Sequence, residues 1–269
     1  MNDLKITLIQ TNLHWEDKVA NLQMLEQKIN SIAGPTNIVV LPEMFSTGFS
    51  MKTELLAEKM DGETIAWMKQ TAAAKKMILT GSVMIEEDGH YFNRLIWMLP
   101  NTHYGHYDKR HLFAFGEEDK HYTPGHKRTI ACVNGWKINL QVCYDLRFPV
   151  WARQQVPPPS EEGQEWEAEY DILLYVANWP ERRIHAWKTL LTARAIENQC
   201  YVAGINRVGS DGNNIIYSGA SMVIDPLGEV LYLKEQEEDI FTITLSRQHL
   251  EEVRNKFPFA KDADDFLLV

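Results

Sequence analysis

The sequence predicts an α/β protein in which mixed sheets carry helices on their outer faces. In the first half of the chain, apolar runs of strand length alternate with segments whose apolar residues recur at helical spacing. In the second half, paired strand segments predominate, and turn dipeptides separate them. This combination favours sheets whose exposed faces are covered by helices.

Strands are expected where short runs of β-branched and apolar residues are bounded by turn residues. The expected strands are residues 5–10, 37–41, 77–86, 91–99, 129–133, 136–142, 171–177, 201–206, 215–224, 230–233 and 241–245. Two dipeptides within this series, Asp88-Gly89 and Asn134-Gly135, predict tight hairpin turns.

Helices are expected where apolar residues recur every three or four positions. The residues that predict the first helix are Val19, Leu22, Leu25, Ile29 and Ile32. Gly34 and Pro35 then end that helix. Further helices are expected at residues 63–76 and 181–199, and a short one begins near Pro149.

Residues 156–169 interrupt this pattern with three consecutive prolines and five glutamates. The composition predicts a solvated loop, and an interaction motif is the less favoured alternative.

Composition excludes several classes of protein. The net charge is −10, from 27 basic and 37 acidic residues, and such a surface repels nucleic acid phosphates and anionic lipid. No apolar segment is long enough to span a membrane, and the first ten residues do not resemble a signal peptide. The odd count of three cysteines argues against a disulfide framework. We therefore expect a cytoplasmic protein, with one domain over residues 1–269.

Three reactive side chains follow segments where apolar strands end. Glu43 follows a buried run, Lys109 follows the aromatic run around Tyr104 and Tyr107, and Cys143 follows the strand at 136–142. Ligand clefts form at strand ends in α/β sheets, so these positions are candidates for a site. Taken singly, Glu43 could be an ordinary loop residue and Lys109 a solvated surface residue.

The context of Cys143 differs from that of the other cysteines. Cys132 and Cys200 lie inside apolar stretches and are expected to be buried. Cys143 is followed at once by the polar, bulky segment 144–147. A strand-to-helix turn here would expose the sulfur beside a helix N-terminus and lower the pKa of the thiol. Cys143 is therefore the candidate nucleophile, with a small core residue as the alternative.

At these residues the sequence resembles the nitrilase superfamily of carbon–nitrogen hydrolases. The segments that carry the resemblance occur in the family's order and cover nearly the whole chain. They are Leu41-Pro42-Glu43, residues 107–112, residues 142–149, Ala177-Asn178-Trp179-Pro180, residues 193–199 and residues 219–228. Within the superfamily the chain looks most like the ω-amidase branch, on the basis of Asn178-Trp179-Pro180 and its compact length.

The resemblance implies a four-layer α-β-β-α sandwich that pairs into homodimers or higher homo-oligomers. It implies hydrolysis of the terminal amide of short 2-oxo dicarboxylic acid monoamides, such as 2-oxoglutaramate and 2-oxosuccinamate. No metal and no cofactor are implied. The small-molecule ω-amide is the expected partner, and no nucleic acid or membrane partner is expected.

The resemblance also implies a role for each site residue. Cys143 would attack the amide, Glu43 would move protons, and Lys109 with the backbone N–H of Tyr144 would hold the oxyanion. Glu118 matches the family's second glutamate, with Glu117 and Asp119 as alternatives.

Other residues are candidates for binding the substrate. An ω-amidase substrate carries a carboxylate, and an arginine fork is its usual partner. Arg147 lies four residues after Cys143, about one helical turn on, although a structural salt bridge is the alternative. The remaining substrate-binding candidates are Phe45, His111, Trp179 and Arg183.

Two other readings of the chain remain open. The same triad would serve an N-carbamoyl amine hydrolase, a nitrilase or another aliphatic amidase. A metal- or partner-binding module is the non-enzymatic alternative, because five of the nine histidines lie between His103 and His126. In a strand, however, His103 and His106 would face opposite sides.

Overall fold

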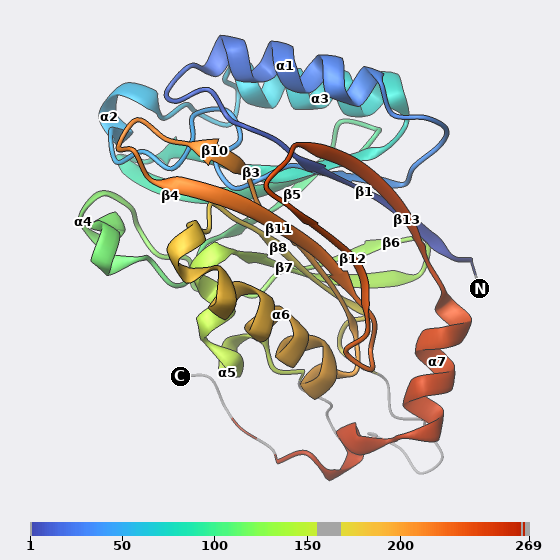
Figure 1. Ribbon diagram of the computed structural model, residues 1–269. Helices are drawn as coiled ribbons and strands as arrows, with labels where there is room; N and C mark the ends of the chain where they lie inside the picture. Colours follow the sequence, from blue (N-terminus) through green and yellow to red (C-terminus); the bar gives the residue numbers. More distant parts are fainter. Residues whose placement is uncertain (1, 155–167, 265, 267–269) are drawn as a thin grey trace.

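The computed structural model describes residues 2–154, 168–264 and 266. Two sheets face each other, and helices cover the outer face of each (Figure 1). Helices α1 (Lys18–Asn30) and α3 (Glu63–Lys75) cover the first sheet, and α5 (Pro149–Ala152) and α6 (Ile184–Asn198) cover the second. This arrangement confirms the expected four-layer α-β-β-α sandwich.

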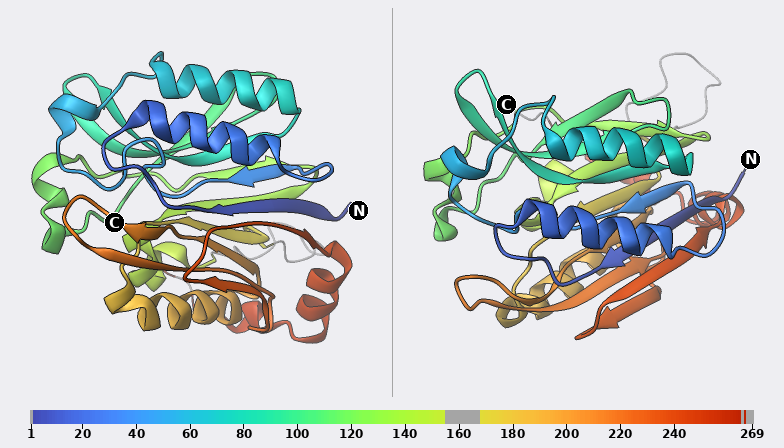
Figure 2. Two further views of the ribbon diagram at one scale, coloured as in Figure 1. Left: turned by 45° about the horizontal axis from the view of Figure 1, so that its top comes forward. Right: turned by 90° about the horizontal axis from the view of Figure 1, so that it is seen from above.

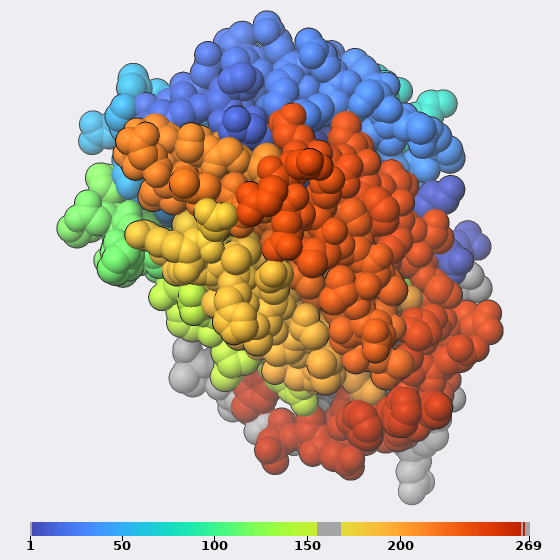
Figure 3. Space-filling view, viewed as in Figure 1, coloured from blue at the N-terminus to red at the C-terminus, as the bar shows by residue number. Residues whose placement is uncertain are grey.

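The first sheet has six strands in the order β13-β1-β2-β3-β4-β5. Their bounds are β1 Leu4–Gln10, β2 Ile38–Val40, β3 Ile78–Glu87, β4 His90–Met98, β5 Tyr104–Asp108 and β13 Asp239–Leu245. β1, β2 and β3 run parallel, and the other pairs are antiparallel. Because β13 pairs with β1, an early and a late segment of the chain lie side by side, and blue and orange-red atoms adjoin in Figure 3.

The second sheet has seven strands in the order β10-β11-β9-β8-β7-β6, with β12 also paired to β11. Their bounds are β6 Ile130–Val133, β7 Trp136–Val142, β8 Ile172–Val176, β9 Tyr201–Ile205, β10 Val208–Ser210, β11 Ile216–Ile224 and β12 Val230–Glu235. β7, β8 and β9 run parallel. Each sheet therefore has a parallel centre, and the carboxyl ends of its central strands meet at one edge.

Apolar side chains fill the spaces between the layers. The space between the sheets holds Leu8 and Val40 of the first sheet and Leu140 and Leu174 of the second. A separate cluster joins the first sheet to α1 and α3. Figure 2 shows α1 and α3 side by side on one face of the sandwich and α6 on the opposite face. The central strands are buried on both faces, as their continuous apolar runs predict.

Nearly all of the expected elements occur, within a few residues of their predicted bounds. Both hairpin turns have the positive φ angles of a type I′ turn, at Asp88 and Gly89 (52° and 77°) and at Asn134 and Gly135 (50° and 81°). The helix expected at 181–199 begins as a 3-10 turn and continues as α6. Most of the predicted 156–169 loop lies outside the described residues.

Some details of the prediction were wrong or incomplete. Val19 is exposed and Ile32 lies beyond the end of α1, so neither belongs to the buried face of that helix. Helix α7 (Arg247–Lys256) was not predicted, because Leu250 and Val253 are its only buried apolar residues. The short helices α2 (Thr53–Leu56) and α4 (Glu118–His121) and strands β5 and β10 were also missed. Among the described residues, no helix is long and apolar enough to cross a membrane.

We predict that Leu140→Ala destabilises the protein by about 2–5 kcal/mol, because Leu140 is fully buried between the sheets and its loss leaves a cavity. Chemical denaturation monitored by circular dichroism would measure the change. Leu231→Ala is the matched control, since Leu231 of β12 is 44% exposed. Equal effects of the two substitutions would contradict this account of the core.

Candidate active site

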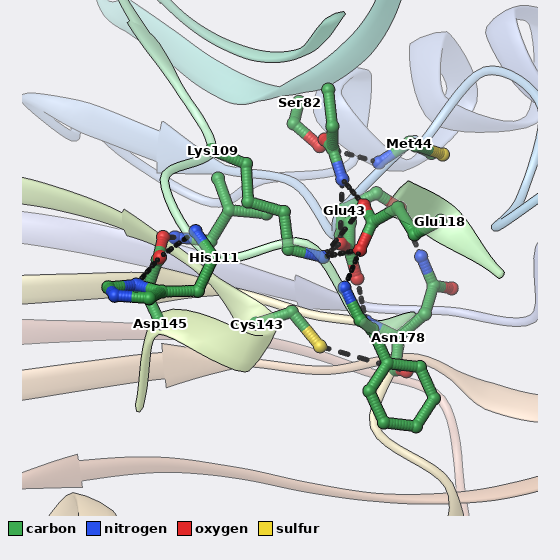
Figure 4. Close-up of polar contacts among 12 residues, drawn as sticks. Glu43, Met44, Ser82, Lys109, His111, Glu118, Cys143, Asp145 and Asn178 are labelled. Carbon is green, nitrogen blue, oxygen red and sulfur yellow. Dashed lines mark hydrogen bonds and ion pairs between the residues drawn. The ribbon is translucent and has the colours of Figure 1, made fainter. Parts of the chain in front are cut away.

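The predicted triad comes together at the edge where the central strands of both sheets end (Figure 4). Glu43 lies three residues beyond β2, Lys109 directly follows β5, and Cys143 directly follows β7. The facing sheets thus bring together side chains that are 34 to 100 residues apart in sequence. All three are at most 9% exposed.

Lys109 is the centre of this site. Its ammonium donates to Glu43 Oε1 at 3.0 Å and to Glu118 at 2.9 and 2.8 Å, and all three side chains are buried. Burial alone lowers the pKa of Lys109, but the charges of Glu118 and Glu43 more than offset it and raise the pKa. Lys109 is therefore a permanent cation in the site.

Glu118 is fixed in the first residue of α4. Besides Lys109, its carboxylate accepts the backbone N–H of Phe113 at 2.6 Å. Burial raises the pKa of Glu118, Lys109 opposes the rise, and Glu43 adds to it. The alternatives Glu117 and Asp119 do not take this place, because Glu117 pairs with Lys120 and both residues are exposed, whereas Lys109 is buried.

Glu43 is held by two asparagines that sequence analysis did not identify as site residues. Asn93 of β4 donates to Glu43 Oε1 at 2.8 Å and to Glu118 Oε1 at 3.2 Å. The backbone N–H of Asn178 donates to Glu43 Oε2 at 2.8 Å, and its side chain donates to the Glu43 carbonyl. A polar residue in an apolar strand is the signal that could have identified Asn93. Asn178 could have been identified by a different signal, namely its position just after the end of β8.

Cys143 begins a 3-10 turn, Cys143–Arg147, and has a positive φ of 43°. Its sulfur lies 3.9 Å from the carbonyl oxygen of Asn178. Burial raises the pKa of the Cys143 thiol well above its ordinary value, Glu43 raises it further, and Lys109 opposes this rise. The expected lowering of the thiol pKa is therefore wrong, because burial raises this pKa by more than the charge of Lys109 lowers it.

A pocket of about 410 Å³ opens onto Cys143 and Lys109. Aromatic rings line much of its wall, and Arg147, Arg182 and Arg183 line it as well. Arg147 lies over the ring of Trp179 and Arg183 over the ring of Phe113, at 5.0 and 4.9 Å. Within the described part of the chain, no carboxylate pairs with any of these three arginines. Glu16, Glu117 and Asp211 line the pocket too, so its wall carries both charges beside the reactive floor.

A family model of carbon–nitrogen hydrolases matches residues 5–255. The chain belongs to the carbon–nitrogen hydrolase family. The omega-amidase YafV of Escherichia coli K12 is 43% identical to it over the full length of both chains. The 2-oxoglutaramate amidase of Bacillus subtilis is 31% identical over 96% of each chain. A CN-hydrolase superfamily protein of Xanthomonas campestris, solved with an arsenic adduct in its active site, is 44% identical with a TM-score of 0.94 and complete coverage of both chains.

Three of the predicted substrate-binding residues of this carbon–nitrogen hydrolase line the pocket, namely Arg147, Trp179 and Arg183. The reason given for Arg147 was wrong, because the turn is a 3-10 helix, in which positions three apart align. Phe45 and His111 do not line this pocket. Phe45 packs in the core under Gly81, and the ring of His111 stacks on Phe148 while its Nδ1 bonds Asp145.

The other two cysteines lie away from the pocket. Cys200 is buried, as expected, and burial raises its pKa to about 12. Cys132 is exposed, so the expectation that it is buried was wrong. It lies on β6, the last strand of the second sheet. No group of three or more potential metal ligands occurs among the residues that the structure describes.

Together these groups are suited to acyl transfer through a thioester. A buried protonated thiol needs a base beside it, and Glu43 is the neighbouring carboxylate that interacts with it. A fixed cation next to both can stabilise negative charge that develops on a substrate oxygen.

We predict that Glu43→Gln lowers turnover by about 100- to 10,000-fold, because glutamine keeps the shape of the side chain but cannot accept the thiol proton. Steady-state ammonia release would measure the loss. Iodoacetamide labelling of Cys143 should persist in this variant, since the charge that raises the pKa of the thiol is removed. Wild-type turnover would remove Glu43 from the mechanism, and loss of labelling would instead indicate a collapsed pocket.

Proposed function

We propose that this protein is an ω-amidase that hydrolyses the terminal amide of short 2-oxo dicarboxylic acid monoamides, such as 2-oxoglutaramate and 2-oxosuccinamate. The observation that carries the proposal is the joining of two features in one pocket. Its floor holds a thiol beside a lysine with two carboxylates, and its wall holds arginines that no carboxylate of the described residues pairs with. The names of the E. coli and B. subtilis relatives support the same substrate class.

In the acylation step, the sulfur of Cys143 attacks the amide carbon and Glu43 accepts the thiol proton. The carbonyl oxygen becomes an oxyanion, which Lys109 and the backbone N–H of Tyr144 stabilise. Glu43 then passes the proton to the amide nitrogen, and the carbon–nitrogen bond breaks to release ammonia. Glu118 and Asn93 hold Lys109 and Glu43 in place throughout.

In the deacylation step, a water molecule attacks the thioester carbon. Glu43 accepts a proton from this water and returns it to the sulfur, which restores the thiol of Cys143. The sum of both steps is amide plus water giving carboxylic acid and ammonia. No metal or organic cofactor enters this balance.

Arg147 recognises the carboxylate at the other end of the substrate. Its guanidinium lies against Trp179, which leaves its N–H groups available to a carboxylate. Arg183 contributes to the same wall, and burial together with the charge of Arg182 lowers its pKa. These guanidinium groups favour an anionic substrate over a neutral one.

We further propose that the whole chain forms one hydrolase domain that acts in the cytoplasm as a homodimer or a higher homo-oligomer. Val150 of α5 and Ile196 of α6 are exposed apolar residues on the outer layer, where a second copy would cover them. All three cysteines are free thiols, which fits a reducing compartment. Neither a nucleic acid nor a membrane partner enters the proposal.

We predict ammonia release from 2-oxoglutaramate or 2-oxosuccinamate, but not from N-carbamoyl amines or nitriles. An enzyme-coupled ammonia assay over this panel would measure it. Activity confined to carbamoyl amines or nitriles would replace the ω-amidase proposal by one of those activities on the same residues.

Cys143→Ala should abolish this activity while leaving the melting temperature close to that of the wild type, because the small residue keeps the turn but removes the nucleophile. Cys132→Ala and Cys200→Ala are the matched controls and should stay active, since neither thiol lines the pocket. Turnover that survives in Cys143→Ala would rule out a thioester route.

We predict that Arg147→Ala lowers kcat/KM for the acid substrate roughly 10- to 150-fold, which is the equivalent of about 1.5–3 kcal/mol for a charged hydrogen bond. Arg147→Lys should also be impaired, because lysine lacks the planar fork. The methyl ester of the substrate, which has no carboxylate, serves as the comparison on both enzymes. Equal losses of kcat/KM on acid and ester would show that Arg147 has a structural role. Arg183 would then be the next candidate for binding the carboxylate.

A further inference from the structure

Asp145 is a buried carboxylate that none of the steps above uses, although it lies two residues after the nucleophile. It is fully buried beneath the 3-10 turn that Cys143 begins. Four donors converge on it from two different segments of the chain. A carboxylate with this many partners is fixed in orientation, so it can fix what it binds.

The first segment is the one that carries Lys109. Oδ1 of Asp145 accepts the backbone N–H of His111 at 3.0 Å and Nδ1 of its ring at 2.8 Å (Figure 4). Oδ2 accepts the hydroxyl of Tyr107 at 2.8 Å. That hydroxyl in turn accepts the backbone N–H of Arg110 at 3.2 Å. The residues on both sides of Lys109 are thus bound to one carboxylate.

The second segment is the nucleophile turn itself. Oδ2 of Asp145 accepts the backbone N–H of Val142 at 3.0 Å, which closes a loop across Cys143. The φ of 43° at Cys143 is unfavourable for a residue with a side chain, and it persists only where the surroundings hold it. The hydrogen bond from Val142 to Asp145 is one such restraint. The same oxygen also accepts the Tyr107 hydroxyl, so this restraint links the turn to the segment that carries Lys109.

Neutral side chains cannot replace this arrangement. The four groups that face Asp145 are all donors, and its two oxygens accept two of them each. An asparagine would present an N–H₂ group to one side, so the hydrogen bond from the backbone N–H of either His111 or Val142 would be lost whichever way it is oriented. The rings around the network, Phe148 stacked on His111 at 3.7 Å and Trp151 bonded to Tyr107, exclude water from it.

We infer that Asp145 is a positioning residue that sets the placement of Cys143 relative to Lys109 by binding both of their segments at once. His111 belongs to this network and acts through Asp145, without contact with the substrate. The inference rests on the proposed thioester mechanism, but it concerns the geometry of the nucleophile and does not depend on the identity of the amide.

Asp225 offers a matched control elsewhere in the fold. It is also a buried aspartate, and it accepts two backbone N–H groups, from Leu227 and Glu229, and a histidine nitrogen of His249 at 2.8 Å. It lies in the turn between β11 and β12, and neither Asp225 nor His249 lines the pocket. Asp225→Asn therefore removes the same type of hydrogen bonding without touching the active site.

The test compares kcat and KM for the ω-amide in Asp145→Asn, Tyr107→Phe and Asp225→Asn. Asp145→Asn should lower kcat by about 100-fold or more, the loss that a misplacement of about 1 Å brings, with little change in KM. Tyr107→Phe should lower kcat less, by roughly 10-fold. The double variant should fall no further than Asp145→Asn alone, since Tyr107 acts through Asp145. Asp225→Asn should lower the melting temperature and leave kcat unchanged.

A second measurement does not need the substrate. The pH midpoint for alkylation of Cys143 by iodoacetamide reports the surroundings of the thiol, including the distance to Lys109. This midpoint should shift in Asp145→Asn and Tyr107→Phe and stay at the wild-type value in Asp225→Asn. If the midpoints behave in this way while no ω-amide is hydrolysed, the substrate proposal fails and the positioning role stands.

Two further variants keep the test decisive if Asp145→Asn does not fold. His111→Asn retains a donor near the position of Nδ1 and should keep most of the wild-type kcat, whereas His111→Leu removes the donor and should behave like Tyr107→Phe. Equal activity of His111→Asn and His111→Leu would overturn the inference. It would also be overturned by a wild-type kcat and alkylation midpoint in folded Asp145→Asn or in Tyr107→Phe.

Discussion

The ion cluster of Lys109 with Glu43 and Glu118 is the interaction on which the site depends. Three buried charges are costly to remove from water, and the two carboxylates are tolerated because each lies within hydrogen-bonding distance of Lys109. The cluster joins the ends of β2 and β5 to α4, so the sandwich must be assembled before the site exists. Removing Lys109 would leave both carboxylates uncompensated, at a cost of about 3–5 kcal/mol.

Burial also determines the state of the nucleophile. A thiol that burial holds protonated attacks an amide only when a base takes its proton, so we expect turnover to depend on Glu43. Asn93 and Asn178 fix the direction of that carboxylate with N–H donors. The site thus differs from one that lowers a thiol pKa at a helix end. Here Glu43 and Lys109 are held in fixed positions, and the proposed activation of the thiol depends on both.

Sequence patterns predicted most of the fold because the central strands and long helices have clear apolar periodicity. They also identified Glu43, Lys109 and Cys143, since each ends a strand and lies in a family motif. They missed Asn93, because a polar residue inside a strand reveals its role only when the facing sheet is in place. They misjudged the thiol pKa for a similar reason: desolvation depends on what covers Cys143, and β8, β5 and α4 are distant in sequence. His111 was assigned to the substrate because motif position does not say which way a ring points.

In the proposed mechanism, chemistry and recognition occupy different parts of the pocket. The floor is supplied by strand ends of both sheets, whose positions the two buried cores fix. The arginines of the wall follow β7 and β8 in short 3-10 turns, at Cys143–Arg147 and Glu181–Arg183. Changes in those turns can alter which acid is bound without moving Lys109 or Glu43. The exception is the turn of Cys143–Arg147, which carries the nucleophile at its first position and Arg147 at its last. Its geometry must serve both functions, and this explains why a buried carboxylate at its third position restrains it.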